Sequence, residues 1–106
     1  MLYFKYSELL ERLFERTKNG VADWQATPRE DEYIIYLQGY SISLQSSFSS
    51  YVIAIRNDKG KVIDEFTVWG HDLHWEKVNE IYTTARRKAL KIDEVVEEVL
   101  KQLRSA

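Results

Sequence analysis

The chain has 106 residues, of which 44% are hydrophobic and 30% charged, and its formal net charge is −2. This length has room for one core and one domain over residues 1–106, and the composition excludes an extended disordered chain. The absence of cysteine excludes disulfides and thiolate zinc sites, and the near-neutral charge excludes the strong positive field of a dedicated nucleic-acid binder.

The N-terminal segment predicts no export signal. Residues 1–6 lead directly to charged Glu8, and no window of the chain is long and apolar enough to span a membrane. Since the chain also lacks cysteine, which suits a reducing compartment, we expect a soluble cytoplasmic protein with no membrane partner.

The first predicted element is an amphipathic helix over residues 7–19. Its apolar residues recur at spacings of three and four, as Leu9, Leu10, Leu13 and Phe14. We expect Ser7 to be the N-cap and Gly20 to take the left-handed conformation that ends the helix.

Strand patterns follow this helix. A short strand is expected within residues 21–27, and Pro28 with the polar residues after it predicts a loop. Residues 33–37 and 40–44 are rich in aromatic and β-branched side chains, and Gln38 with Gly39 predicts a tight hairpin between them.

Alternation in the second of these strands predicts two different sheet faces. Tyr40, Ile42 and Leu44 are expected to face the core, whereas Ser41, Ser43 and Gln45 are expected to face water or a partner. The lightly covered serine side is therefore a candidate binding surface.

Two more strands are predicted over residues 51–56 and 61–69, joined by a turn that ends at Gly60. Alternation lapses near residues 64–66, which predicts a bulge or a sheet edge.

A long helix is then predicted from the apolar spacing that begins at Trp75, with Asp72 as its N-cap. A break near Ile92, with Asp93 as a cap, would start a final helix; one continuous helix is the alternative. The final stripe is Val95, Val96, Val99, Leu100 and Leu103.

The element order predicts an α+β fold. It consists of an N-terminal helix, an antiparallel meander of three to five strands, and one long or two consecutive C-terminal helices packed on one sheet face.

Several segments together resemble a known pattern: LLER at residues 9–12, TKNG at 17–20, Trp24, GYSI at 39–42, and ARRKAL at 85–90 followed by Asp93 and Glu94. Over most of its length the chain resembles a group of small uncharacterised prokaryotic proteins. The resemblance implies a prokaryotic domain and transfers no catalytic or binding residue, because the group has no assigned activity. Lys91 stands where such proteins are expected to carry a helix-stopping glycine.

The element order is also similar to the double-stranded-RNA-binding fold, which has an α-β-β-β-α layout. That fold carries a basic start to its last helix, whereas residues 71–76 of this chain form no lysine cluster. The similarity therefore transfers no RNA-binding residue.

One segment suggests a metal site. His71 and His74 lie three residues apart beside Asp72 and Glu76, and two imidazoles with carboxylates can converge on a divalent metal. In the structural alternative, Asp72 caps the helix, Glu76 complements its dipole and both histidines lie at the surface.

Arg86, Arg87, Lys88 and Lys91 form the strongest basic cluster and are the candidate nucleic-acid-binding residues. Consecutive helical residues point about 100° apart, so these side chains spread around the helix and do not form a compact phosphate clamp.

The sequence defines no activity, no catalytic residue, no metal ligand set and no cofactor site. Asp64 and Glu65 point to opposite sides of a strand, and no nucleophile is linked to them by spacing. We therefore favour a non-enzymatic protein-interaction module whose partner is a second copy or another protein. Its contact surface would be the serine side of the sheet or the strand at residues 61–69. The alternatives are a nucleic-acid-associated protein that uses the basic cluster and, third, a small metal-dependent enzyme at the two histidines.

Overall fold

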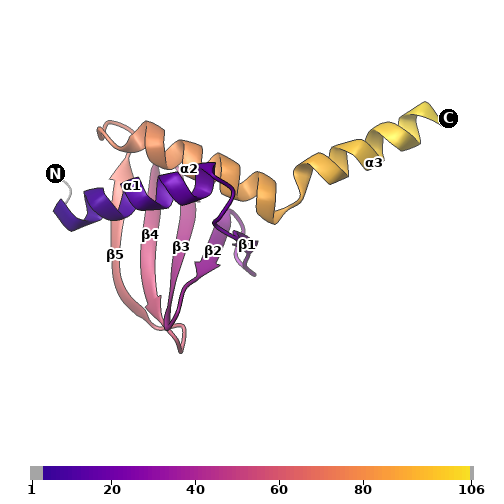
Figure 1. The fold of residues 1–106 in the computed structure, drawn as a ribbon. Coiled ribbons are helices and arrows are strands. Elements are labelled where there is room, and N and C mark those ends of the chain that lie inside the picture. The colour runs from indigo at the N-terminus through magenta and orange to yellow at the C-terminus, as the bar shows by residue number, and fades with distance from the viewer. Residues whose placement is uncertain (1–3, 106) are drawn as a thin grey trace.

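The computed structural model describes residues 4–105 and has the predicted α+β fold (Figure 1). Within these residues, one helix precedes a five-stranded antiparallel sheet in the order β1-β2-β3-β4-β5, and two helices follow it. Short turns can join all the strands, because each one pairs with the next along the chain. The elements are α1 Phe4–Lys18, β1 Gln25–Ala26, β2 Glu32–Tyr36, β3 Tyr40–Ser47, β4 Ser50–Asn57, β5 Val62–Trp69, α2 Trp75–Ala89 and α3 Ile92–Arg104.

α1 starts earlier than its polar signal predicts. Ser7 lies inside the helix, so its prediction as the N-cap is wrong. The cause is a tertiary contact: the Tyr6 ring stacks on Phe66 of β5 with 4.1 Å between ring centroids, which favours ordered helix ahead of Ser7. The other end is as predicted, because Gly20 takes φ 74° just beyond the helix.

β1 is shorter than the predicted strand at residues 21–27. The chain before it is held by other partners: the Ala22 carbonyl accepts a hydrogen bond from Lys88 Nζ at 2.8 Å. The indole N–H of Trp24 donates to Thr17 Oγ1 at 3.0 Å, and the Trp24 side chain is buried. These contacts fix the segment against α1 and α2, and only two residues are left to pair with β2.

The remaining strands pair as their alternation predicts. The hairpin between β2 and β3 closes with Gly39 at φ 77°, and Ile42 lies opposite both Ile35 and Ile55. The pairing of β4 with β5 shifts between Ile55 and Arg56, so Ile63 is an extra residue in β5. β5 is thus both an edge strand and a bulged strand, the two features that the lapse in alternation suggests.

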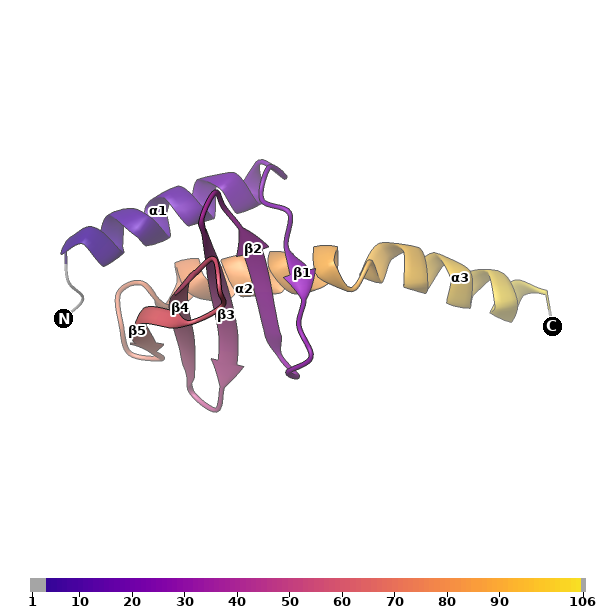
Figure 2. The ribbon, with the colours of Figure 1, turned by 90° about the horizontal axis from the view of Figure 1, so that it is seen from below.

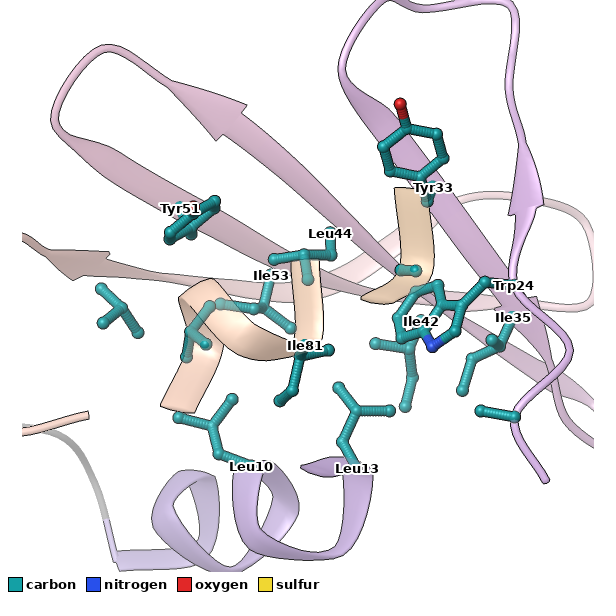
Figure 3. Packing of buried hydrophobic residues seen from close by; sticks show 14 of the residues in the cluster. Leu10, Leu13, Trp24, Tyr33, Ile35, Ile42, Leu44, Tyr51, Ile53 and Ile81 are labelled. Atoms are coloured by element: carbon teal, nitrogen blue, oxygen red, sulfur yellow. The ribbon is translucent and has the colours of Figure 1, made fainter. Parts of the chain in front are cut away.

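α1 and α2 lie side by side on one face of the sheet, and no helix of residues 4–105 covers the other face (Figures 1 and 2). Between these layers the side chains of Leu10, Ile53 and Ile81 meet, each almost fully buried (Figure 3). Two amphipathic helices therefore cover the apolar side of the meander.

α2 begins at Trp75, and its N-cap His74 makes no side-chain capping bond. The prediction of Asp72 as the N-cap is wrong. Asp72 instead accepts a hydrogen bond from the Trp69 backbone N–H at 2.9 Å and so closes the turn after β5. The Trp75 ring packs against Tyr51 of β4, with centroids 4.7 Å apart, and this contact holds the first residue of the helix against the sheet.

The C-terminal region is two helices and not one rod. The break lies at Lys91, which takes the left-handed conformation with φ 52° and ψ 48°. Asp93 is not the cap that the sequence predicts, because it lies in the first turn of α3 and its carboxylate pairs with Arg87. A glycine would fit the conformation of Lys91 without strain.

α3 contacts the end of α2 and leads away from the sheet (Figures 1 and 2). Of its side chains, all within the described region, none is buried. Among residues 4–105, no helix has the length and apolar character needed to cross a membrane.

Candidate functional site

α3 presents apolar side chains to solvent from Val95 to Leu103, and Ile92 at its start is half-buried. Its apolar residues at positions 92, 96, 99 and 103 follow spacings of four, three and four, so they share one side of the helix. Val99 is 50% exposed and Leu103 is 69% exposed. We call this surface the α3 stripe; it consists of Ile92, Val95, Val96, Val99, Leu100 and Leu103.

The equivalent stripes of the other helices are buried. Leu10 of α1 and Val78 of α2 have no exposed surface, because both face the sheet. The sequence predicts the residues of the α3 stripe, but it gives no sign that they stay open. They stay open because α1 and α2 already occupy the covered face of the sheet (Figure 2).

The charges of α3 are divided along its axis. Asp93, Glu94, Glu97 and Glu98 lie in the N-terminal half, and Lys101 and Arg104 lie in the last turn. At 100° per residue, Glu94 and Lys101 point away from the stripe, whereas Glu97 and Arg104 lie on one flank of it, 3.9 Å apart, and Glu98 lies on the other flank.

The serine side of the sheet is the face that no helix of residues 4–105 covers, as alternation predicts, but its serines are not open to solvent (Figure 2). Ser41 and Ser43 are 4% and 2% exposed, so the expectation that they face water is wrong. Arg56 lies across them: its Nε donates to Ser43 Oγ at 3.4 Å, and its guanidinium is 4.0 Å from the Glu32 carboxylate. Small side chains such as serine are shielded from solvent by longer neighbours such as Arg56, even on the sheet face that no helix covers.

The prediction that Tyr40 faces the core is also wrong. Tyr40 is 55% exposed because it starts β3 at the end of the sheet that is distant from the helices. With the exposed Tyr36 it lines a groove of about 360 Å³ that also contacts Arg56 and Asp58. This groove is interrupted by the charged side chains of Arg56 and Asp58.

The predicted contact strand, residues 61–69, is largely β5. Its outer edge is poorly suited to pairing with another strand, because the bulge at Ile63 distorts it. The Glu65 backbone N–H is bonded to Asp64 Oδ1 at 3.0 Å, and the Trp69 N–H is bonded to Asp72. The edge therefore carries features that block strand addition.

The two histidines have different surroundings. His71 is exposed, whereas His74 is half-buried with its Nε2 3.2 Å from Ser7 Oγ. No group of three or more potential metal ligands exists within residues 4–105. The serine–histidine contact joins residues 67 apart in sequence, which spacing alone cannot reveal. Among the described residues, no carboxylate bonds the other ring nitrogen to complete a triad.

Two residues of the predicted basic cluster are engaged within the chain. Lys88 donates to backbone carbonyls of the loop between α1 and β1, and Arg87 pairs with Asp93. Arg86 and Lys91 are exposed. Arg87 and Lys88 thus stabilise the junction of α1, α2 and α3.

Two tyrosines on the helix side of the sheet have shifted ionisation. Burial raises the pKa of the Tyr51 hydroxyl, and burial, followed by the nearby Tyr33 and Asp31, raises the pKa of Tyr82. Tyr51 donates to Asn79, and the Tyr82 hydroxyl donates to Asp31 at 3.4 Å. Both groups stay neutral and act in packing.

Comparisons with family models, with curated proteins and with solved structures gave no match. The candidate site therefore depends on geometry alone. Of the surfaces described above, the α3 stripe is the one that is both apolar and unshielded.

Proposed function

We propose that this chain is a non-enzymatic protein-interaction module and that the α3 stripe is its docking surface. One observation carries the proposal: α3 has the apolar pattern of a packed helix, yet none of its described side chains is buried. Apolar surface in water costs about 25 cal/mol per Å² relative to burial. A contiguous exposed apolar patch of this kind is typical of interaction sites.

Helix stability supports the same conclusion. α3 has 13 residues, and isolated helices shorter than roughly 12–15 residues are marginal in water. Packing of an amphipathic face normally supplies the missing stability. The α+β body does not supply it here, so a partner that covers the α3 stripe would stabilise the helix.

The charges of α3 favour a protein partner over a membrane surface. Helices that lie on membranes are rich in lysine and arginine on their polar face. α3 has four acidic residues and two basic ones, so anionic lipid headgroups would repel it.

The enzymatic and nucleic-acid alternatives have weaker support. The Ser7–His74 pair lacks an orienting carboxylate among residues 4–105, and these residues include no candidate metal group. Arg87 and Lys88 of the basic cluster are already paired within the chain.

Site-specific photo-crosslinking in an extract of the source cells tests the proposal. A photoreactive side chain at Val99 lies in the α3 stripe, and one at Lys101 lies on the opposite side of the same helix. We expect a discrete protein adduct from position 99 and little from position 101. Equal adducts from both positions, or none from position 99, would contradict the docking role of the stripe.

A further inference from the structure

We infer that the partner of the α3 stripe is a second copy of this chain, whose α3 packs antiparallel to the first around a two-fold axis. This inference rests on the proposed function for the location of the docking surface. It adds the identity of the partner and the geometry of the contact.

The spacing of the stripe suits an antiparallel helix pair. Positions 92, 96, 99 and 103 alternate between the two core positions of a heptad. In the antiparallel arrangement Val96 packs on Val99 of the second copy, and Ile92 packs on Leu103. Each contact then occurs twice, as a two-fold interface requires.

The flanking charges select this orientation. Asp93 and Arg104 lie on the same flank of the α3 stripe at opposite ends of the helix, with Glu97 between them, and within the monomer they form exposed ion pairs with Arg87 and Glu97 respectively. In this register, antiparallel pairing places Arg104 of each copy level with residue 91 of the other, about 3 Å along the axis from its Asp93, and brings the two Glu97 residues level with each other near the two-fold axis. Parallel pairing would place the acidic halves of both helices side by side, where like charges repel.

The shape of the molecule agrees with this arrangement. α3 projects from the body, so antiparallel pairing places the two bodies at opposite ends of the helix pair (Figures 1 and 2). The helix is about 20 Å long at 1.5 Å per residue, which limits the contact area. Such small interfaces are typical of weak complexes, and we expect a dissociation constant in the micromolar range.

The first test is light scattering of the untagged full chain over a concentration series. We expect a monomer–dimer equilibrium that Val99→Asp weakens by at least tenfold. Lys101→Gln lowers the net charge by the same unit on the opposite side of α3, and we expect it to change the dissociation constant less than threefold. A monomer at all concentrations, or equal effects of both substitutions, would overturn the inference.

The second test determines the orientation. The chain has no cysteine, so single cysteines give an unambiguous readout. In an antiparallel pair, residue 92 of one copy lies about 16 Å along the axis from residue 92 of the other, and the two residues 103 are equally far apart. This separation exceeds the roughly 7 Å limit for a disulfide. We expect Ile92→Cys and Leu103→Cys to form a disulfide with each other in a mixture and little with themselves. Self-crosslinking of each variant alone would overturn the antiparallel arrangement.

The two proposals fail in different ways. A monomer whose position 99 still crosslinks to a different protein overturns self-association and supports the docking role of the stripe. A monomer with no adduct from position 99 overturns both.

Discussion

Lys91 is the residue that separates two helices with opposite surroundings. Its left-handed conformation, at φ 52°, costs an L-residue roughly 1–2 kcal/mol. The last turn of α2 tightens just before it, where the Lys91 N–H donates to the Lys88 carbonyl at 3.2 Å. Because of this bend, the apolar residues of α2 as far as Ala89 pack on the core, whereas those of α3 beyond Ile92 face solvent.

Ionisation of Tyr82 makes the stability of the fold fall with rising pH in the alkaline range. Its pKa in the folded state is raised above the unfolded value, so the neutral hydroxyl stabilises the fold fully below about pH 10, the unfolded pKa. This stabilisation is lost as pH rises above that value. We expect Tyr82→Phe to reduce the fall in the free energy of unfolding between pH 9 and 11, as followed by urea denaturation. The exposed Tyr36, changed to Phe, is the control; an equal effect there would contradict the role of Tyr82.

At the scale of elements, α2 and α3 have similar apolar spacing and different environments. Both are amphipathic and both end in basic residues, but α2 buries Val78, Ile81 and Ala85 while α3 buries none of its described side chains. The difference does not lie in local propensity. It arises because the bend directs α3 past the edge of the sheet (Figure 1).

We expect the body to fold without α3. Ending the chain after Leu90 removes no buried side chain, and it breaks one exposed ion pair between α3 and the body, that of Arg87 with Asp93. The free energy of unfolding, measured by urea at low protein concentration, should therefore change by less than about 1 kcal/mol. An unfolded or strongly destabilised product would show that α3 is part of the cooperative unit.

At the scale of the whole molecule, stability comes from one layer of side chains between the helices and the sheet. Ile53 of β4 lies in this layer and has no exposed surface. We expect Ile53→Ala to lower the free energy of unfolding by about 2–5 kcal/mol, because it leaves a cavity.

Val99→Ala removes apolar atoms from a half-exposed site. It should change the free energy of unfolding by less than about 0.5 kcal/mol under conditions where the protein is monomeric. Chemical denaturation of both variants at the same low concentration compares them directly. Similar losses would mean that the α3 stripe is packed on the body in solution.

The sequence alone determined the order and type of the elements. Period-two alternation predicts β3 and β4, spacings of three and four predict α1 and α2, and Gly20 and Gly39 mark chain reversals. These signals are local, because each reflects the backbone geometry of a few consecutive residues. The helix break near Ile92 was one of two alternatives that the sequence left open, and the cap expected at Asp93 lies inside α3.

The tertiary structure decided which surfaces are covered. Ser7 and Asp72 looked like helix caps, but the stacking of Tyr6 and the packing of Trp75 moved both helix starts. Ser43 is buried because Arg56 from the neighbouring strand crosses it. Each outcome depends on a residue distant in sequence, which periodicity does not report.

The openness of the α3 stripe is a property of the same kind. Its pattern in the sequence is that of a buried helix, with spacings of three and four like those of the α2 stripe. The sheet has one apolar face, which α1 and α2 fill, so the third amphipathic helix has no place left on its own chain (Figure 2). The sequence determined that α3 has an apolar side, and the limited area of the sheet decided that this side stays free.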